Sequence, residues 1–334
     1  MPYYMISART TPDSDKAAQT LKYLRSDDNG KTYAAVPVAN WVNEIIDYLQ
    51  APGKAPTQEI LFFVHGFNVS QDSAAASHLE YSQSLHDAGW DGLLISFDWP
   101  SAGLTFAYLP DREQARITAS RLISGGVRLL QNAQRRKCTI AVNLMCHSMG
   151  AFVAETAFTS AYQDVPPNWS VNQLILVAAD IGAGGLAEGE KTAIAFDTHA
   201  GRVTTYTDRY DKALAVSNTK RLGLSPRLGR VGLPDTAPDL MCSVDCSALF
   251  DAVDPTLLLH LDPQKTHCFY FDQPVFWQDV VLTLGGGIDR NFIPTRDVLA
   301  KNRFSLKTKA LGDADYKLAL ERADLNQDRT NRLA

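Results

Sequence analysis

The chain has 334 residues, of which 45% are hydrophobic and 21% charged, and its formal net charge is −5. This composition is typical of a folded globular protein and argues against an intrinsically disordered or low-complexity chain. The mild acidity gives no reason to expect a nucleic-acid or anionic-membrane partner, and no apolar run approaches the ~20 residues of a membrane span.

Short apolar runs alternate with longer helical patterns from one end of the chain to the other. The apolar runs predict strands at residues 3–8, 33–38, 59–66, 92–99, 139–146, 172–179 and 202–207, with 239–246 as a weaker candidate. Apolar residues at i, i+3 and i+4 predict helices at residues 74–88, 111–133, 150–162, 274–284 and 313–323. This alternation predicts an α/β fold with a mostly parallel central sheet of about eight strands and helices on both faces.

The same pattern suggests how the chain is organised. We expect residues 1–57 to supply N-terminal strands and a helix joined to the sheet, residues 58–285 to form the core, and residues 286–334 to form a charged C-terminal extension. Residues 215–238 combine leucines and arginines with glycine and proline, a pattern that suits a lid or flap as well as a surface loop. If it is a flap, its arginines Arg221, Arg227 and Arg230 favour an acidic group on the substrate.

The stretch "VNLMCHSMGAF" leads directly from a predicted buried strand into a predicted helix, with Ser148 at the junction. A serine lifted out of a parallel sheet by such a sharp turn is the nucleophile-elbow arrangement, usually written G-x-S-x-G. Here Cys146 replaces the first glycine, while Gly150 is retained. The alternative is a serine that merely caps an ordinary helix, so other features have to decide.

An upstream loop, "FFVHGFNVS", follows the predicted strand at 59–66. Enzymes that transfer acyl groups on this topology place oxyanion-binding backbone in this position. The two expected donors are the N–H groups of Phe67 and Met149. We expect His65 to shape the loop rather than to act as a base.

Acids and a histidine follow Ser148 in the order that this kind of site requires. Asp208 and Asp211 lie just past the predicted strand at 202–207, and His267 precedes the predicted helix at 274–284. Serine needs a neighbouring base because its hydroxyl is barely ionised at neutral pH, and the histidine needs an acid to hold its tautomer. Either aspartate could instead cap a turn or a helix.

These landmarks together resemble the α/β-hydrolase superfamily, and within it a bacterial branch catalogued as a domain of unknown function. The resemblance covers roughly residues 58–285 and runs through "FVHGFN", "FDWPS", "HSMG", "LVAADI", "YTDRYDKAL" and "HCFYFDQP". It implies that Ser148 is the nucleophile and His267 the base. For the acid it ranks Asp211 first, Asp180 second and Asp208 third.

Several other residues could belong to the site. His260 is a rival base, although its setting in "LLLHLD" favours packing. Trp99, Tyr108 and Phe67 could line an acyl pocket, or they could belong to the core.

The sequence thus predicts a serine hydrolase that cleaves a small-molecule carboxylic ester and requires no metal or organic cofactor. A thioesterase or amidase would use the same residues, and an inactive hydrolase scaffold that serves as a binding module is a second class. A zinc site of Cys242, Cys246, Cys268 and His267 is a third, but the C-x3-C spacing is loose. Five cysteines without framework spacing and a start that lacks signal-peptide features favour a cytoplasmic setting.

Overall fold

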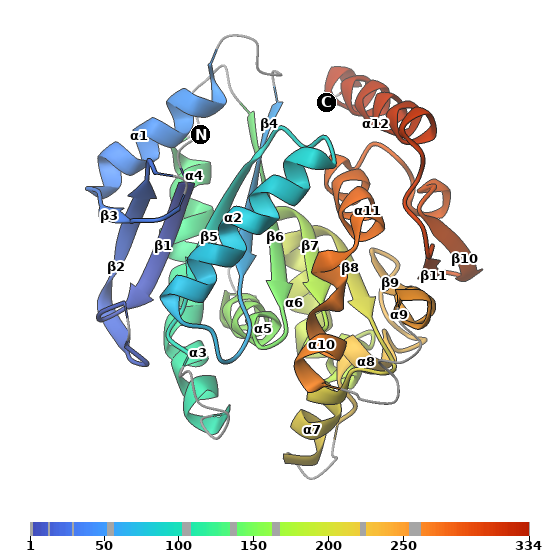
Figure 1. Ribbon diagram of the computed structural model, residues 1–334, viewed down its shortest axis with the longest axis horizontal. Coiled ribbons are helices and arrows are strands. Elements are labelled where there is room, and N and C mark those ends of the chain that lie inside the picture. Colours follow the sequence, from blue (N-terminus) through green and yellow to red (C-terminus); the bar gives the residue numbers. More distant parts are fainter. Residues whose placement is uncertain are drawn as a thin grey trace.

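In the computed structural model, the described residues are 3–12, 14–28, 30–51, 57–101, 108–133, 139–161, 168–220, 225–253 and 262–333. They form one sheet of 11 strands that runs through the centre of the molecule, in the order β10-β11-β9-β8-β7-β6-β4-β5-β1-β2-β3 (Figure 1). The eight strands from β11 to β1 are mutually parallel, whereas β10, β2 and β3 pair antiparallel at the two edges. The expected fold class is correct, but the expected count of about eight strands is too low because it omitted β2, β10 and β11, which lie toward the two edges.

The strands have the following bounds: β1 Tyr3–Arg9, β2 Ala17–Ser26, β3 Ala34–Ala35, β4 Thr57–Val64, β5 Leu93–Asp98, β6 Thr139–His147, β7 Val171–Val177, β8 Ala200–Thr207, β9 Met241–Asp245, β10 Arg296–Ala300 and β11 Arg303–Leu306. The α-helices are α1 Val38–Leu49, α2 Gln71–Asp87, α3 Tyr108–Leu122, α4 Arg128–Asn132, α5 Gly150–Ala161, α6 Lys191–His199, α7 Lys212–Lys220, α8 Leu228–Val231, α9 Ser247–Val253, α10 Pro263–Cys268, α11 Pro274–Gly285 and α12 Asp313–Leu333. A π-helical turn at Ile123–Val127 joins α3 to α4, and short 3-10 helices lie at Ala183–Leu186, Phe269–Asp272 and Arg290–Phe292.

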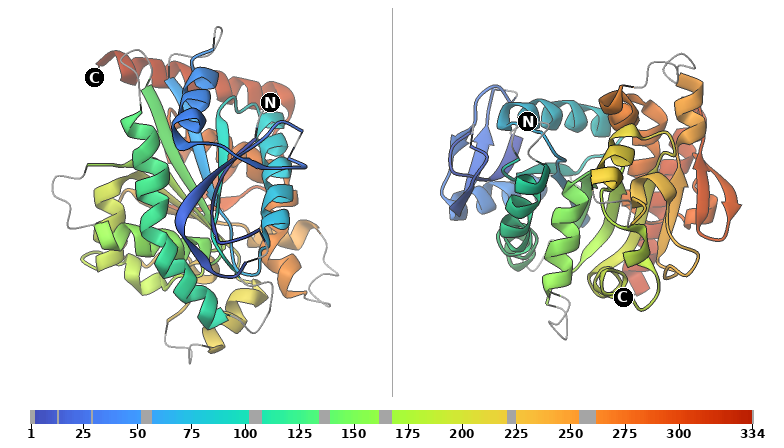
Figure 2. Two further views of the ribbon diagram at one scale, coloured as in Figure 1. Left: turned by 90° about the vertical axis from the view of Figure 1, so that its left-hand side faces the viewer. Right: turned by 90° about the horizontal axis from the view of Figure 1, so that it is seen from below.

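The side chains of β4 show why the sheet is covered on both faces. Ile60, Phe62 and Val64 point into one buried cluster, with residues of α1, α3, α5 and α6. Leu61 and Phe63 alternate with them and point into a second cluster, with residues of α2, α9 and α11. A strand that is buried on both faces has to be apolar throughout, which is why the sequence pattern identified it. Figure 2 shows the two helical layers on opposite faces of the sheet.

The N-terminal segment differs from the sequence prediction in one strand. Residues 33–38 were expected to form a strand, but only Ala34–Ala35 pair with β2, and α1 begins at Val38. The reason is the amphipathic spacing of Trp41, Ile45 and Leu49, all of which are fully buried against the core. Strand β2 was not predicted because its sequence, "AAQTLKYLRS", is half-exposed and mixed in polarity.

The C-terminal segment, residues 286–334, is an integral part of the sheet and of one helical layer. Strand β11 pairs in parallel with β9, β10 closes this edge, and α12 packs through Tyr316, Ala319 and Ala323 onto Leu282 of α11. None of the described helices is long and apolar enough to cross a membrane.

The register of the central strands brings four chain segments to one edge. Val64 of β4 pairs with Cys146 of β6, His147 with Val177 of β7, and Val177 with Tyr206 of β8. The carboxyl ends of these strands are therefore level, and the loops that follow them meet at the same edge of the sheet. In parallel sheets this is the edge where ligands bind.

Candidate active site

Ser148 occupies a strained turn between β6 and α5. Its φ is 54°, which is uncommon for a residue with a side chain. The turn is held on both sides, because the Ser148 N–H donates to the Val177 carbonyl at 3.0 Å and the Ser148 carbonyl accepts from the Asp180 N–H at 3.0 Å. Strain that the surrounding structure enforces in this way is typical of functional sites.

Two glycines make the turn possible. A Cβ at Gly150 would lie 2.3 Å from the Val64 carbonyl oxygen, and a Cβ at Gly66 would lie 2.8 Å from the Ser148 Cβ. Neither position can therefore hold a side chain unless the backbone moves. Cys146, at the usual first glycine of the motif, is fully buried in the core, and burial holds the pKa of its thiol well above its ordinary value. The cysteine thus fits the elbow as a packing residue and not as a second nucleophile.

His267 and Asp211 form a buried pair beside this turn. His267 Nδ1 lies 2.6 Å from Asp211 Oδ2, and these side chains are 11% and 0% exposed, respectively. The other carboxylate oxygen of Asp211 accepts from the Leu214 N–H at 2.9 Å, at the start of α7. The Lys212 N–H donates to Thr266 Oγ1 at 3.1 Å, so α7 and α10 are joined next to the pair. Asp211 is therefore fixed both as a helix cap and as the partner of His267.

The charge state of His267 follows from two opposing effects. Burial lowers the pKa of His267, but the charge and hydrogen bond of Asp211 and the charge of Asp180 together raise it by more, so that the pKa lies above its ordinary value of 6.5. A hydrogen bond from Nδ1 to a carboxylate also sets the tautomer and leaves Nε2 to accept a proton.

His147 is a neighbour that the sequence analysis did not select, although it directly precedes the serine. Its Nε2 lies 3.2 Å from the His267 carbonyl oxygen, and the two imidazole rings are 4.7 Å apart. Burial and the proximity of His267 hold the pKa of His147 well below its ordinary value, so the ring is neutral and donates this hydrogen bond. His147 thereby links the Ser148 turn to the segment that carries His267. Ser148 Oγ and His267 are not hydrogen-bonded to one another in this structure, and such contacts are often long before substrate binds.

The other two candidate acids have different partners. Asp180 Oδ1 accepts from Ser217 Oγ at 2.8 Å and lies 3.2 Å from Arg227 Nε. Asp208 Oδ1 accepts from the Tyr210 N–H at 3.0 Å, and burial raises the pKa of Asp208 to about 7. Of the three, Asp211 is the one whose carboxylate is hydrogen-bonded to His267.

The loop after β4 lies against Ser148. The close approach of Gly66 to the Ser148 Cβ puts the backbone of Gly66 and Phe67 next to the serine. Met149 follows Ser148 at the start of α5, and among the described residues its N–H has no hydrogen-bond acceptor. The two expected oxyanion donors are thus carried by segments that flank Ser148, and their role remains a prediction.

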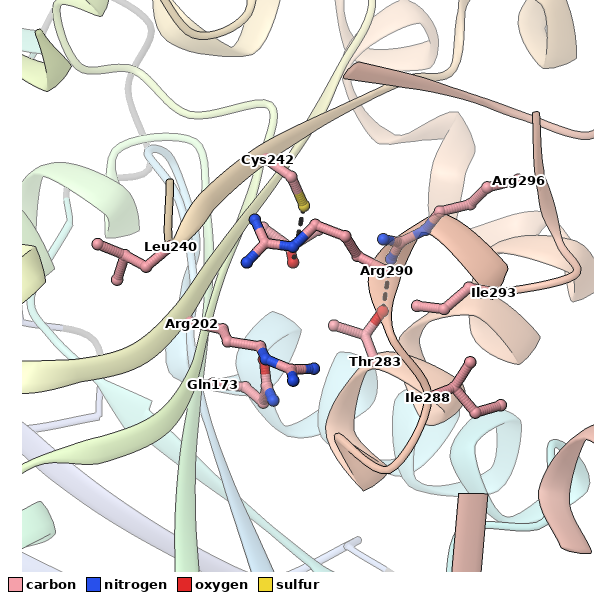
Figure 3. A pocket seen from close by; sticks show the side chains of 10 residues that line it. Gln173, Arg202, Leu240, Cys242, Thr283, Ile288, Arg290, Ile293 and Arg296 are labelled. Atoms are coloured by element: carbon pink, nitrogen blue, oxygen red, sulfur yellow. Dashed lines mark hydrogen bonds between the residues drawn. The ribbon is translucent and has the colours of Figure 1, made fainter. Parts of the chain in front are cut away.

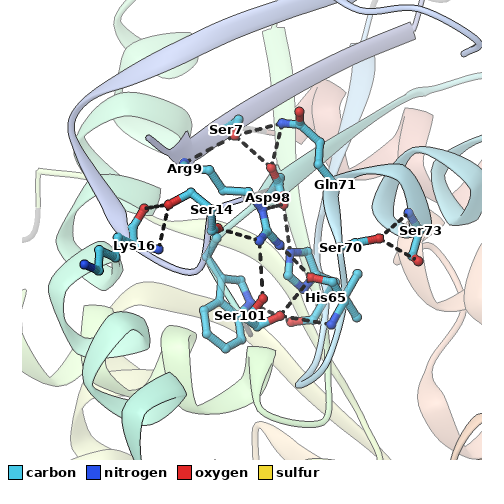
Figure 4. Close-up of polar contacts among 12 residues, drawn as sticks. Ser7, Arg9, Ser14, Lys16, His65, Ser70, Gln71, Ser73, Asp98 and Ser101 are labelled. Atoms are coloured by element: carbon cyan, nitrogen blue, oxygen red, sulfur yellow. Dashed lines mark hydrogen bonds and ion pairs between the residues drawn. The ribbon is translucent and has the colours of Figure 1, made fainter. Parts of the chain in front are cut away.

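A buried polar network holds this loop in place (Figure 4). Arg9, which is 2% exposed, donates from Nε to Asp98 Oδ1 at 2.7 Å and from Nη2 to the Val69 carbonyl at 2.6 Å. His65 Nε2 contacts the same Asp98 oxygen at 3.3 Å, and Ser101 Oγ both accepts from the Val69 N–H and donates to the Val69 carbonyl. The expectation that His65 shapes the loop agrees with these contacts.

The predicted pocket aromatics lie in different surroundings. Trp99 is fully buried; it stacks on His65 and donates from Nε1 to the His65 carbonyl at 2.8 Å. Trp99 therefore packs against the buried side of the loop after β4, and it does not form the pocket wall that was expected of it. Phe67 is half-buried, and the side chain of Tyr108 lies outside the described residues.

The segment proposed as a flap contains a well-packed stretch at residues 227–229. Leu228 and Arg227 are buried, and the N–H groups of Leu228 and Gly229 donate to the carbonyls of Ile181 and Ala179. A Cβ at Gly229 would lie 2.3 Å from the backbone of Ala178. Residues 227–229 therefore pack into the core beside the site, unlike a mobile flap, whereas Pro226, Arg230 and Val231 are exposed. Arg221 lies outside the described residues.

Two alternatives from the sequence remain, His260 as the base and a zinc site built from cysteines and His267. His260 lies outside the described residues. Cys242, Cys246 and Cys268 are free thiols, and in the part of the chain that the structure describes no group of three or more His, Cys, Asp or Glu side chains is placed to hold a metal.

Comparison with protein families gives one match, to a family described as "Alpha/beta hydrolase of unknown function" (DUF900), over residues 42–254. The chain belongs to this family. The matched range contains Ser148, Asp180 and Asp211 and ends before His267. A comparison with curated protein sequences found no match.

Among solved structures, the fold is similar to that of phosphonate-inhibited esterase B from Lactobacillus rhamnosis, with 11% identity and a TM-score of 0.39 over 86% of this chain and 85% of that chain. It is also similar to an esterase from Pyrobaculum calidifontis, with 12% identity and a TM-score of 0.34 over 70% of this chain and 78% of that chain. Similarity at this level is too low to say anything about the reaction or the substrate.

Proposed function

We propose that this protein is a serine hydrolase that cleaves a carboxylic ester through an acyl-enzyme intermediate. The observation that carries the proposal is the juxtaposition of a strained serine, Ser148 at φ 54°, with a buried His267–Asp211 pair whose hydrogen bond is 2.6 Å long. Folding alone would not require either feature. The backbone conformation of Ser148 costs conformational energy, and the buried Asp211 carboxylate costs free energy unless it is paired.

In the proposed cycle, Ser148 Oγ attacks the ester carbonyl while His267 Nε2 takes the serine proton. Asp211 stabilises the resulting imidazolium through the hydrogen bond at Nδ1. The N–H groups of Phe67 and Met149 bind the tetrahedral oxyanion, and such a donor contributes about 3–4 kcal/mol to the stabilisation of the transition state. The alcohol leaves with a proton from His267, and a water molecule repeats the sequence on the acyl-enzyme.

His147 and Arg9 act through other residues in this proposal. His147 holds the His267 backbone at 3.2 Å, so it positions the base. Arg9 and Asp98 hold the loop that carries Phe67, because Arg9 binds the Val69 carbonyl and Asp98 contacts His65. The N-terminal strand β1 would thus contribute to the oxyanion site although two strands, β4 and β5, separate it from β6 in the sheet.

The test is an ester panel of graded acyl length, together with fluorophosphonate labelling, on the wild type and on Ser148→Ala. We expect the variant to lose at least about 10⁴-fold in kcat/KM and all labelling, with an unchanged circular dichroism spectrum. A matched control is Ser160→Ala, because Ser160 is an exposed serine at the far end of the same helix α5. Ester turnover or labelling by folded Ser148→Ala would contradict the proposal. Faster cleavage of thioesters or amides than of every ester would instead replace the substrate class.

A further inference from the structure

A small cavity lies at the opposite edge of the sheet from Ser148. It is lined by Gln173 and Arg202, near the starts of β7 and β8, and by Leu240, just before β9. Its other walls come from α11 and from residues 288–296. The volume is about 10 Å³, which is room for one particle of about the size of a water molecule.

Three arginines converge on this cavity (Figure 3). Arg202 comes from β8, Arg290 from the 3-10 helix Arg290–Phe292, and Arg296 from the start of β10. Their guanidinium groups point toward the same space, and its described lining contains no aspartate or glutamate. A cavity wall with three cations and no acid has an excess of positive charge.

Part of this charge is already balanced. Arg296 is 6% exposed and forms a buried ion pair with Asp279, at 2.7 Å from Nη2 to Oδ1. Arg202 Nη1 donates to the Gly286 carbonyl, which carries no full charge. Asp289 acts on both Arg290 and Arg202, and Asp239 acts on Arg290, but both carboxylates are exposed and Asp239 is paired with Lys301. One carboxylate inside therefore faces three guanidinium groups.

Donor atoms at the cavity also lack acceptors. Nη1 of Arg290 and Nη1 of Arg296 are buried atoms without a hydrogen-bond partner. An unpaired N–H of a buried cation is costly, and the structure would be stabilised by an acceptor that carries negative charge. Gln173, which is 5% exposed, also has an unpartnered amide oxygen, and turning that amide over would present its NH2 group instead.

We infer that this cavity binds a monovalent anion of the size of chloride, which it admits through a small outward shift of the half-buried Arg202 and Arg290 side chains. The anion accepts from Arg290 and Arg296 and balances Arg202, so it joins residues 290–296 to the sheet. The volume is too small for phosphate or for an organic carboxylate. The site is separate from the Ser148 edge and does not depend on the proposed hydrolase activity.

The test uses thermal unfolding and diffraction with bromide as the anomalous substitute for chloride. At constant ionic strength, replacing sodium gluconate with sodium chloride or bromide should raise Tm by about 2 °C or more, with a saturable dependence on concentration. Crystals soaked in bromide should show an anomalous peak between the guanidinium groups of Arg202, Arg290 and Arg296.

Arg290→Gln should abolish both the anion-dependent rise in Tm and the bromide peak. The matched control is Arg116→Gln on α3, because it removes the same charge from an exposed arginine on the other side of the sheet, 57% exposed. This control should keep the full effect. Equal Tm values in gluconate and chloride without a bromide peak would show that the cavity holds only water. A rise in Tm that survives in Arg290→Gln would be a general salt effect, and either result would overturn the inference.

Discussion

Replacing Asp211 with Asn should nearly abolish catalysis while leaving the fold intact. The amide oxygen of Asn can still accept from the Leu214 N–H, so the cap of α7 is retained. What is lost is the attraction between the carboxylate and the imidazolium that forms during the reaction. At 2.6 Å and an effective dielectric constant of about 20, this attraction is about 6 kcal/mol. That energy corresponds to a loss of roughly 10⁴-fold in rate.

The assay is kcat/KM on the best ester of the panel, with urea unfolding as the check on the fold. Asp180→Asn is the matched comparison, since Asp180 is another buried aspartate at the same sheet edge whose oxygen binds Ser217 and Arg227 instead of His267. We expect it to retain most of the activity of the wild type. Folded Asp211→Asn with activity within about tenfold of the wild type, or an equal loss in both variants, would refute the assignment of Asp211 as the acid.

Three further predictions concern pH and stability. Because the pKa of His267 is raised above 6.5 and the ring must be neutral to act, the acid limb of kcat/KM should lie above pH 6.5 and should move to lower pH in Asp180→Asn; a flat profile from pH 5 to 9 would exclude His267 as the base. Arg9→Met should lower the free energy of unfolding in urea by about 3–5 kcal/mol, because it leaves the Asp98 carboxylate buried without its main partner, and a change below about 1 kcal/mol would contradict this account of the loop. The pKa of Asp208 is raised from 3.8 to about 7, so the folded state binds a proton that the unfolded chain releases, and stability falls as the pH rises through this range; the Tm advantage of Asp208→Asn over the wild type should therefore grow from pH 5 to pH 8, and a constant difference would refute it.

Much of the fold could be predicted from local pattern. Strands β4 to β8 are apolar on both faces because helices cover both sides of the sheet, and this requirement is visible residue by residue. The sequence pattern did not predict the strands toward the edges, because one of their sides meets solvent or a short partner strand. The sequence of β2 is mixed in polarity, and only its pairing with β1 makes it a strand. In β10, four of the five residues are exposed. Their identity depends on pairing, which local composition does not encode.

The candidate site divides in the same way. The positions of Ser148, Gly150 and the downstream Asp and His follow from the chain order that an elbow at a parallel sheet requires. The choice among Asp180, Asp208 and Asp211 does not, since all three follow strand ends of the same edge. The choice of acid depends on the position of His267 in α10. Helix α10 is joined to α7 by the hydrogen bond from the Lys212 N–H to Thr266 Oγ1.

The sequence by itself determined that this chain is an α/β protein with a serine at a strand-to-helix turn, because both features arise from residues adjacent in the chain. Only the tertiary structure decided that Asp211 meets His267, that His147 contacts the His267 backbone, that Trp99 packs behind the loop after β4, and that Arg202 shares a cavity with Arg290 and Arg296. Each of these contacts joins residues from different elements. Their distances depend on how the helices pack on the sheet, and that packing is settled by the whole core at once.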